Sequence, residues 1–372
     1  MSRPWAQVLI VQERLPHYRV PFFEQLREHL HRDDIDLAVV HGEGTRTDAA
    51  RGDEGALPWA HVVSNRSIPV GQSRIVWQPV TGCVNGVDLV IVEQASRLVV
   101  NYPLLTRQAL GGPRIAFWGH GANLQAGPSL LSRFSETVKT RYSRRPHWWF
   151  AYTEGSARRV EALGFDPDRI TVVQNAVDTR VIEATTADRD NQRCIYVGGL
   201  YTAKRLDLVF AAADILAKAV PGFSLAIVGA GELSGYVQSE AARRSYVDYL
   251  GAKFGRELAV ELRRSSAMLM PGAVGLGVLD AFAAALPVIT AAGTGHGPEF
   301  EYLTHGDNGL VAEPTPMSLA DATLVALDPC KSARFRHGAC QASTRFTLDN
   351  MVNRFGAGIR AACDLQPSST VR

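Results

Sequence analysis

The segment with the clearest capacity for chemistry is the glycine-rich run at residues 271–287. One apolar run precedes it and another follows, so the pattern predicts a strand, a glycine loop, a helix and a second strand. The first N–H groups of a helix lack partners and carry partial positive charge, so the turn from Gly272 to Gly277 suits negatively charged or hydroxyl-rich ligands. Asp280 follows on the same helix, where its carboxylate can accept hydrogen bonds from a sugar or ribose. The alternative is a structural loop whose glycines let helix and sheet pack closely.

The elements that must position this loop alternate between strands and helices. A strand at residues 6–11 and a helix at 21–30 open the chain, and Phe22, Leu26 and Leu30 recur at fourfold spacing on that helix. Further strands are predicted at residues 36–40, 88–92, 115–118, 148–152 and 170–173. A second series has strands at 194–197, 225–228, 247–250, 267–270 and 288–291, with a helix at 206–219. This alternation predicts mostly parallel, helix-covered sheets.

The length of 372 residues predicts two domains. The polar segment at residues 179–193 is the best boundary, so we expect one Rossmann-like domain at 1–178, a hinge at 179–193 and a second such domain at 194–345. An apolar stripe predicts a helix at 346–365 that packs back toward the N-terminal domain, followed by a tail at 366–372. Open α/β domains bind ligands at the carboxyl ends of their strands, which places the expected site in the cleft between the domains.

Composition excludes several classes of protein. A formal net charge of +2 gives no field that would indicate a nucleic-acid partner. The five cysteines have no paired spacing, which argues against a zinc site or disulfide framework and fits a reducing cytoplasm. No secretory leader or apolar run of 18 residues is visible, so neither secretion nor membrane spanning is expected. The Gly229–Gly231 turn lacks the third glycine of a dinucleotide fingerprint, because Ser234 stands there, so an NAD enzyme is not expected.

One local segment is basic and runs into aromatic residues. Its five cations are Arg133, Lys139, Arg141, Arg144 and Arg145. Such a surface could meet anionic lipid headgroups, which would place the protein in the cytoplasm or at the inner face of the membrane. The competing interpretation is a solvated helix face followed by a buried strand that contains Trp149 and Phe150.

Several motifs together resemble family 4 of the retaining glycosyltransferases. The motifs are Asn175-Ala176-Val177-Asp178, Val197-Gly198-Gly199-Leu200 with Lys204, Val228-Gly229-Ala230-Gly231, the block at 271–287, Gly297-Pro298-Glu299 and Gly306-Asp307-Asn308-Gly309-Leu310. The resemblance is strong over residues 170–312. It is weaker in the N-terminal half, where residues 15–23 and Gly119-His120-Gly121 look like cleft-facing loops. The resemblance implies a GT-B fold, with two Rossmann-like, doubly wound parallel-sheet domains facing across a cleft. The acceptor side is then N-terminal, and the nucleotide-sugar donor side C-terminal.

The resemblance also implies roles for individual residues. Lys204 would stabilise charge on the leaving diphosphate, and His120 would meet the donor sugar. Tyr18 and Arg19 are candidates for contact with the phosphates or the acceptor, although Arg19 could instead form an ion pair on the surface. Glu299 and Asn308 would shape the loops around the donor. The donor-binding candidates are Gly198, Gly199, Arg205, Gly229, Gly272, Ala273, Val274, Gly275 and Asp280.

The chain departs from the family pattern at three of these positions. Gly199 stands where many relatives have Arg, and Gly272 and Asp280 replace two Glu residues. Backbone N–H groups of Ala273 to Gly275 would then have to contact the sugar, while Asp280 could still bind the ribose. These losses leave open a weakened or inactive relative.

The implied reaction moves a hexose-type sugar, with retention, from a UDP- or GDP-sugar to a hydroxyl group of a saccharide, a lipid-linked acceptor or a small molecule. Lys204 and the helix N-termini would take the place of the metal ion that other glycosyltransferases use, so we expect neither a metal ion nor another cofactor. Two alternatives are a non-catalytic nucleotide-sugar binding protein and a GT-B nucleotide-sugar epimerase.

Overall fold

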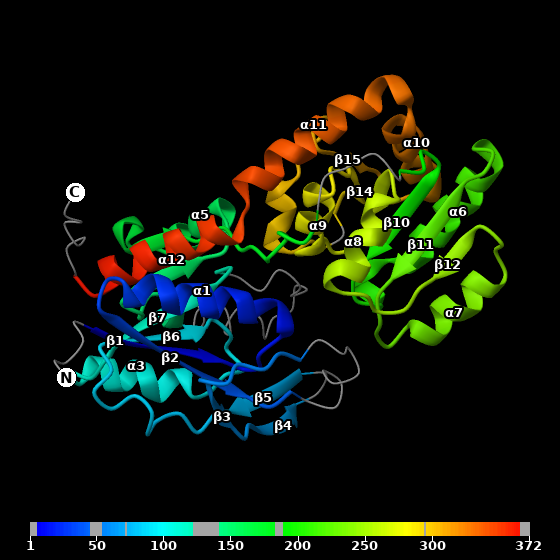
Figure 1. Cartoon of the computed structure of the whole chain (residues 1–372). Coiled ribbons are helices and arrows are strands. Elements are labelled where there is room, and N and C mark those ends of the chain that lie inside the picture. The colour runs from blue at the N-terminus through cyan, green and yellow to red at the C-terminus, as the bar shows by residue number, and fades with distance from the viewer. Residues whose placement is uncertain are drawn as a thin grey trace. The chain divides into compact units, whose positions relative to one another are not determined.

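The computed structural model describes residues 6–44, 54–70, 73–121, 141–182, 189–293 and 295–364, and the chain folds into two compact units (Figure 1). Unit 1 comprises Met1–Ala49, Asp53–Asn175 and Leu348–Arg372, and unit 2 comprises Ala50–Gly52 and Ala176–Thr347. The units divide after Asn175 rather than after residue 178, and the predicted hinge ends one residue too late because Arg193 already belongs to a strand. Residues 183–188 of that hinge and the tail lie outside the described residues.

Unit 1 is built on a seven-stranded sheet in which every pairing is parallel. Its strands are β1 (Ala6–Gln12), β2 (Ile35–Gly42), β3 (His61–Val63), β6 (Leu89–Glu93), β7 (Arg114–Gly119), β8 (Trp148–Ala151) and β9 (Ile170–Val172). The order β3-β2-β1-β6-β7-β8-β9 puts the reversal of strand order between β1 and β6. At such a switch point, the loops leave the sheet in opposite directions and open a crevice at the carboxyl ends of the strands.

Helices and a hairpin complete unit 1. The helical elements are η1 (His17–Arg19), α1 (Val20–His31), α3 (Asn101–Ala109), α5 (Glu154–Ala162), η2 (Pro167–Arg169) and α12 (Leu348–Ala362). The hairpin pairs β4 (Arg66–Val70) with β5 (Ser73–Trp77) in antiparallel fashion. The sequence analysis missed this hairpin, because all of β4 is exposed and contains Pro69, so it has no apolar alternation.

The C-terminal helix α12 belongs to unit 1, and it lies along α1 in Figure 1. Phe355 is fully buried and stacks on Phe150 of β8 at 4.4 Å between ring centroids. A Cβ atom on Gly358 would lie 2.6 Å from the Thr171 hydroxyl oxygen, so this glycine allows the helix to approach β9 closely. Aromatic packing and one close approach therefore fix the helix on the sheet of unit 1.

Unit 2 repeats the architecture with a six-stranded parallel sheet. Its strands are β10 (Arg193–Val197), β11 (Ser224–Val228), β12 (Val247–Tyr249), β13 (Ala267–Leu269), β14 (Val288–Ala291) and β15 (Gly309–Ala312). Its helical elements are η3 (Thr202–Lys204), α6 (Leu206–Ala219), α7 (Ser234–Ala242), α8 (Gly255–Arg263), α9 (Gly277–Ala283), η4 (Pro298–Tyr302), α10 (Pro316–Leu327) and α11 (Pro329–Arg345). The order β12-β11-β10-β13-β14-β15 places the switch point between β10 and β13. The predicted α/β fold class is confirmed.

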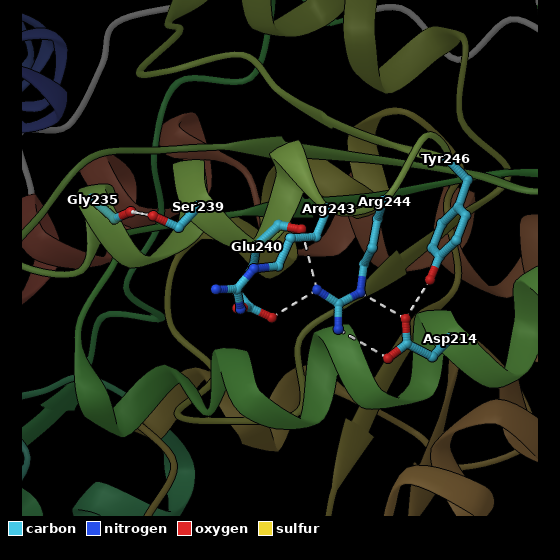
Figure 2. A network of polar contacts seen from close by, with 7 residues as sticks. All are labelled: Asp214, Gly235, Ser239, Glu240, Arg243, Arg244 and Tyr246. Carbon is cyan, nitrogen blue, oxygen red and sulfur yellow. Dashed lines mark hydrogen bonds and ion pairs between the residues drawn. The ribbon is translucent and has the colours of Figure 1, made fainter.

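A polar network joins α6 and α7 in unit 2 (Figure 2). The Arg244 guanidinium donates to Asp214 of α6 at 2.6 and 2.9 Å and to the Glu240 carboxylate of α7 at 2.6 Å. The Tyr246 hydroxyl also donates to Asp214. Because Arg244 bridges two carboxylates on different helices, the network fixes the chain after α7 against α6.

Among the described residues, no helix combines the length and apolarity needed to cross a bilayer.

The packing of α12 gives a test of the fold. Replacing Phe355 with Ala removes a fully buried ring, and we expect the free energy of unfolding of unit 1 to fall by about 3–5 kcal/mol. Urea denaturation followed by tryptophan fluorescence measures this change. Asn353 lies exposed on the same helix, so Asn353→Ala is the matched control and should change stability by less than about 0.5 kcal/mol. Equal effects of the two substitutions would contradict the placement of α12.

Candidate functional site

Three loops meet at the switch point of unit 2. The first leads from β10 to α6, the second from β13 to α9, and the third from β14 to η4. The backbone N–H of Ala273 donates to the Ala203 carbonyl oxygen at 2.9 Å, which joins the first two loops. The backbone N–H of Gly297 donates to the Val274 carbonyl oxygen at 2.9 Å, which joins the second and third. The glycine-rich loop is therefore held on both sides by backbone hydrogen bonds.

Lys204 ends the short helix η3 within the first loop. Its side chain is buried, and its ammonium nitrogen Nζ donates to the Ala273 carbonyl oxygen at 2.5 Å. Burial lowers the Lys204 pKa to about 8, and the negative charge of Glu299 opposes this shift. The Tyr201 ring centroid lies 5.4 Å from Nζ. The ammonium group is thus largely desolvated, which strengthens its attraction to an anion that enters the site.

Gly272 is required by a close approach of two backbones. A Cβ atom at this position would lie 2.2 Å from the carbonyl carbon of Lys204 and 2.4 Å from the Ala203 carbonyl oxygen. The first loop therefore occupies the space into which a side chain at residue 272 would project. The absence of a Glu here has a physical cause, because no side chain fits while these loops are in contact.

The glycine loop offers fewer open amides than the sequence analysis predicted. The Ala273 amide is bonded to Ala203, and the Val274 amide donates to Nδ1 of His296 at 3.2 Å. Both amides are engaged within the protein, and their predicted contact with a sugar stays a prediction. The Gly275 amide forms no hydrogen bond with another described residue. A Cβ atom on Gly275 would meet only Lys204 Nζ, at 4.0 Å, so this position faces the ammonium group across open space.

The glycines that follow β10 and β11 bring the first loop into contact with the loop after β11. A Cβ atom on Gly229 would lie 1.9 Å from the Gly198 carbonyl oxygen, and both residues have φ near +150°, a region that favours glycine. The Gly229 amide donates to the Gly251 carbonyl oxygen at 2.8 Å, and the Gly198 amide to that of Val228 at 3.1 Å. Both amides are engaged within the protein, so these glycines serve loop packing here, and their predicted contact with a donor stays a prediction.

Two other predicted donor contacts lie beside Lys204. A Cβ atom on Gly199 would lie 2.8 Å from the Tyr201 ring, so that ring fills the space into which a side chain at residue 199 would project. Arg205 adopts left-handed backbone geometry, with φ of 52°, and its half-exposed guanidinium pairs with Asp207 at 2.8 Å. Lys204 is consequently the buried cation of this loop, whereas Arg205 is held at the surface.

Asp280 lies on α9, a helix of seven residues. The carboxylate is partly exposed and forms no hydrogen bond or ion pair with another described residue. Burial raises the Asp280 pKa to about 7. A desolvated carboxyl group without a protein partner is suited to exchange hydrogen bonds with the hydroxyl groups of a ligand.

Asn308 has the loop-shaping role that its pattern suggested. Its Oδ1 accepts from the Thr304 amide at 2.7 Å, and its Nδ2 donates to the Tyr302 carbonyl oxygen at 2.9 Å. Glu299 is buried in η4. Its charge acts on Lys204, so it also contributes to the electrostatics of the site.

His296 was missed by the sequence analysis. Its partners are Val274, which lies in a loop 22 residues earlier in the sequence, and Ala291, which ends a strand.

In unit 1, Arg19 is buried at the start of α1 rather than paired on the surface. Its guanidinium donates to Asn175 Oδ1 at 2.7 Å and lies 4.6 Å from the Trp118 ring centroid. A charged hydrogen bond combined with cation–π contact keeps this desolvated group in place. The surface alternative for Arg19 is wrong, and its contact with phosphates or acceptor stays a prediction. Tyr18 is partly exposed beside Arg19, and its ring centroid lies 5.4 Å from the guanidinium carbon.

His120 follows β7 and stacks on Tyr152 with 6.1 Å between ring centroids. Burial, assisted by the charge of Arg159, lowers the His120 pKa below its usual value. Close packing explains both flanking glycines. A Cβ atom on Gly119 would lie 2.8 Å from Gln94, and one on Gly121 would lie 2.7 Å from Val160. The ring is therefore a neutral, partly exposed imidazole, and its contact with a sugar stays a prediction.

A carboxylate pair at the switch point of unit 1 was also missed. Glu13 follows β1, and Glu93 ends β6, so the two acids come to the same edge of the sheet. Glu13 is clamped by Arg74 at 2.7 Å and Arg97 at 2.5 Å. Burial and the neighbouring Glu13 charge raise the Glu93 pKa to about 7. Acidic residues at the ends of two adjacent strands were the available sequence signal.

A polar pocket adjoins this pair. Its lining residues include Glu13, Arg14, Glu43, Asn65, Ser67 and Arg74. The Asn65 Oδ1 atom is buried and has no hydrogen-bond partner among the described residues. The pocket thus presents donors and acceptors of both charge signs, which suits a polyhydroxylated ligand better than a simple anion.

The structure describes three of the five cations in the basic segment of the sequence analysis. Arg133 and Lys139 lie outside the described residues, whereas Arg141, Arg144 and Arg145 are exposed. The Arg144 guanidinium donates to the Leu163 carbonyl oxygen at the end of α5. The aromatic part of the segment belongs to the buried strand β8. The structural interpretation of that strand is therefore correct.

Comparison with known proteins shows the fold. Residues 191–328 match the family model described as Glycosyl transferases group 1, and no curated protein matches the chain. The chain is similar to Anabaena HepE, solved in complex with UDP-glucose, at a TM-score of 0.69 and 16% identity, covering 96% of this chain and 100% of that one. It is also similar to sucrose-phosphate synthase from Thermosynechococcus elongatus, at 0.70 and 14%, covering 95% and 98%. The apo form of the lipopolysaccharide outer core galactosyltransferase WaaB gives 0.65 and 16%, covering 95% and 99%. The fold is GT-B.

The loop contact at Gly272 can be tested by adding one methyl group. We expect Gly272→Ala to lower the free energy of unfolding by about 1–3 kcal/mol, because the Cβ atom overlaps backbone atoms that cannot move independently. Gly235→Ala is the control, since a Cβ atom there meets nothing within 4 Å and the residue lies in α7. Denaturant unfolding measures both variants. A Gly272→Ala variant as stable as the control would show that the loops are not in contact.

Proposed function

We propose that this protein is a retaining glycosyltransferase that moves a hexose-type sugar from a nucleotide diphosphate to an acceptor hydroxyl group. The observation that carries the proposal is the buried Lys204 ammonium group at the switch point of unit 2, beside the open Gly275 position. A desolvated cation next to a free backbone amide is the arrangement that binds a pyrophosphate. The match of residues 191–328 to Glycosyl transferases group 1 supports this assignment.

The donor is proposed to be a UDP-sugar, with a GDP-sugar as the next candidate. Anabaena HepE, which shares the fold, was solved in complex with UDP-glucose, which supports the choice of base. Asp280 would hold the ribose hydroxyl groups. Since its pKa is about 7, its carboxyl group can accept a hydrogen bond when ionised and donate one when protonated.

The proposed mechanism relies on charge stabilisation. As the bond between the sugar and the diphosphate breaks, negative charge gathers on the oxygens of the leaving phosphate. Lys204 and the Gly275 amide interact with that charge more strongly than with the intact donor, so they lower the barrier. The acceptor hydroxyl attacks from the face that the diphosphate leaves, which retains the anomeric configuration, and a leaving-group oxygen takes its proton. In this proposal the ammonium group serves in place of a metal ion.

The acceptor is proposed to bind unit 1. The pocket next to the Glu13 and Glu93 carboxylates has the mixed donors and acceptors that recognise sugar hydroxyl groups. His120 and Tyr18 would contribute from the neighbouring loops. A saccharide acceptor fits this chemistry best, and a lipid-linked saccharide would additionally use the exposed cations Arg141, Arg144 and Arg145 at an anionic membrane surface. The protein would then act in the cytoplasm, peripherally at the inner face of the membrane.

A specific observation supports the alternative of a nucleotide-sugar binding protein without turnover. Gly272 provides no carboxylate, and backbone from the first loop fills that space. A binding protein, a transferase and an epimerase are separated by their products. The first releases none, the second forms a glycoside, and the third converts the donor sugar.

The test begins with thermal unfolding in the presence of UDP-glucose, GDP-glucose and ADP-glucose. A ligand that binds the folded state alone raises the melting temperature, so a shift with one nucleotide identifies the base. The stabilising donor is then incubated with saccharide acceptors, and products are identified by mass spectrometry and by NMR of the anomeric proton. A glycoside with the donor's anomeric configuration supports the proposal. Binding without any product, or inversion of configuration, contradicts it.

The first prediction for catalysis concerns Lys204. We expect Lys204→Ala to lower kcat by about 100-fold or more, since it removes a preorganised charge from the transition state. The matched control is Lys218→Ala, which removes an exposed lysine from α6 in the same unit. Initial rates at saturating donor measure the effect. Turnover in Lys204→Ala close to that of the control would remove Lys204 from the mechanism.

The second prediction concerns pH. Since the Lys204 pKa is lowered to about 8, the free enzyme loses the active ammonium form as the pH rises through that value. We expect kcat/KM to fall above about pH 8, because this ratio reports ionisation of the free enzyme. Lys204→Arg keeps its charge throughout this range, so its profile should stay flat on the alkaline side even if its rate is lower. An alkaline limb that survives unchanged in Lys204→Arg would assign the ionisation to another group.

A further inference from the structure

His296 lies between the glycine-rich loop and the end of β14. Its Nδ1 accepts from the Val274 amide at 3.2 Å, and its Nε2 lies 2.7 Å from the Ala291 carbonyl oxygen. The ring stacks on Phe300 at 4.1 Å between centroids, with an angle of only 4° between the ring planes. Three contacts on three sides thus fix the position and orientation of one imidazole.

These partners determine which nitrogen carries the proton. A backbone N–H is a donor, so Nδ1 must offer its lone pair to Val274, whereas a carbonyl oxygen accepts, so Nε2 must carry the hydrogen toward Ala291. This is the neutral imidazole with its proton on Nε2. Burial lowers the His296 pKa, and the Lys204 charge acts in the same direction. Backbone hydrogen bonding to Ala291 and Gly272 opposes them but does not reverse the shift.

The position of the Val274 amide matters for the next residue. Val274 directly precedes Gly275, whose amide has no hydrogen-bond partner among the described residues and whose Cβ position lies 4.0 Å from Lys204 Nζ. A glycine has wide freedom in φ and ψ, so the peptide before Gly275 needs an external anchor if its N–H is to keep one direction. Ala273 is anchored by Ala203, and Val274 is anchored by His296.

We propose that His296 is a positioning residue that latches the glycine-rich loop through the Val274 amide and thereby holds the Gly275 amide beside Lys204 for the donor pyrophosphate. The ligand part of this inference rests on the proposed function, whereas the latch itself does not. His296 does not touch the reacting atoms in this proposal, so its loss weakens donor binding through the loop.

Protonation of the ring opens the latch. A hydrogen on Nδ1 would face the Val274 N–H, and two donors repel each other. Lys204 from the first loop is the charged group that acts on the ring, and its positive charge disfavours protonation of the imidazole. Since a charged imidazole would also attract a phosphate, donor affinity is best compared at pH 7.5, where the ring is neutral, and the latch is followed separately by exchange of the Val274 amide.

The experiment compares the wild type with His296→Leu and His296→Asn. Leu removes the acceptor, whereas the Asn side-chain oxygen can occupy the place of Nδ1. The matched control is His305→Leu, because the exposed His305 ring also accepts a backbone amide, that of Val311 at 3.0 Å, in a loop before β15. Calorimetric titration with UDP-glucose gives Kd, and hydrogen exchange followed by mass spectrometry gives the protection of the peptide that contains Val274.

We expect His296→Leu to raise Kd for UDP-glucose about 10-fold, because the loop loses one hydrogen bond that orders it for binding. We also expect the Val274 amide to exchange faster. His296→Asn should stay within about threefold of the wild type, and His305→Leu should leave both readouts unchanged. Wild-type affinity and protection in His296→Leu would overturn the proposal. If none of the proteins binds UDP-glucose, the proposed donor is wrong, and the exchange measurement still decides the latch.

Should His296→Leu fail to fold, the pH dependence of Val274 amide exchange tests whether His296 holds this amide. After correction for the intrinsic rate, we expect exchange at Val274 in the wild type to accelerate as the pH falls from about 7.5 to about 5, through the range where histidine gains its proton. His296→Asn has no titrating group at this position and should show no acceleration. The same pH dependence in both proteins would show that His296 does not hold the amide.

Discussion

The contact between two loop backbones at Gly272 is the constraint on which the candidate donor site depends. The Ala273 amide and the Ala203 carbonyl oxygen are joined at 2.9 Å, and the space beside Gly272 is filled by backbone atoms of the first loop. This contact brings Lys204 to the Ala273 carbonyl oxygen and buries its ammonium group. The low pKa of the lysine, its orientation and the absence of a side chain at residue 272 are therefore consequences of one packing arrangement.

Much of the fold could be predicted from the sequence because its strands are buried on both faces and consist of continuous apolar runs. Residues 6–11 and 225–228 are examples, and each was predicted to within one residue at either end. The hairpin of β4 and β5 gave no such signal, since its apolar residues Ile68, Val70 and Ile75 are exposed. The position of α12 on unit 1 depends on contacts with Phe22 and Phe150, which lie far away in sequence.

The candidate site was predictable in its residue types but not in its hydrogen bonds. The glycine loop, Lys204 and Asp280 could be found because they follow strands that end at one edge of a sheet. The partners of the Ala273 and Val274 amides could not, because those partners belong to other loops. Arg19 illustrates the same limit, since its burial depends on Trp118 and Asn175, which the sequence does not place beside it.

Each unit has a partly buried carboxyl group near the switch point of its sheet, and desolvation moves the pKa of that group toward neutrality. Glu93 in unit 1 and Asp280 in unit 2 reach about 7, and Lys204 falls to about 8. Burying such groups costs free energy, so they are retained where a ligand or a reaction uses them. Glu93 has the clamped Glu13 as a neighbour, whereas Asp280 has no partner among the described residues. Because a ribose hydroxyl could satisfy Asp280 and a pyrophosphate could satisfy Lys204 together, one nucleotide-sugar would offset both costs in unit 2, which is the physical argument for a donor at this switch point.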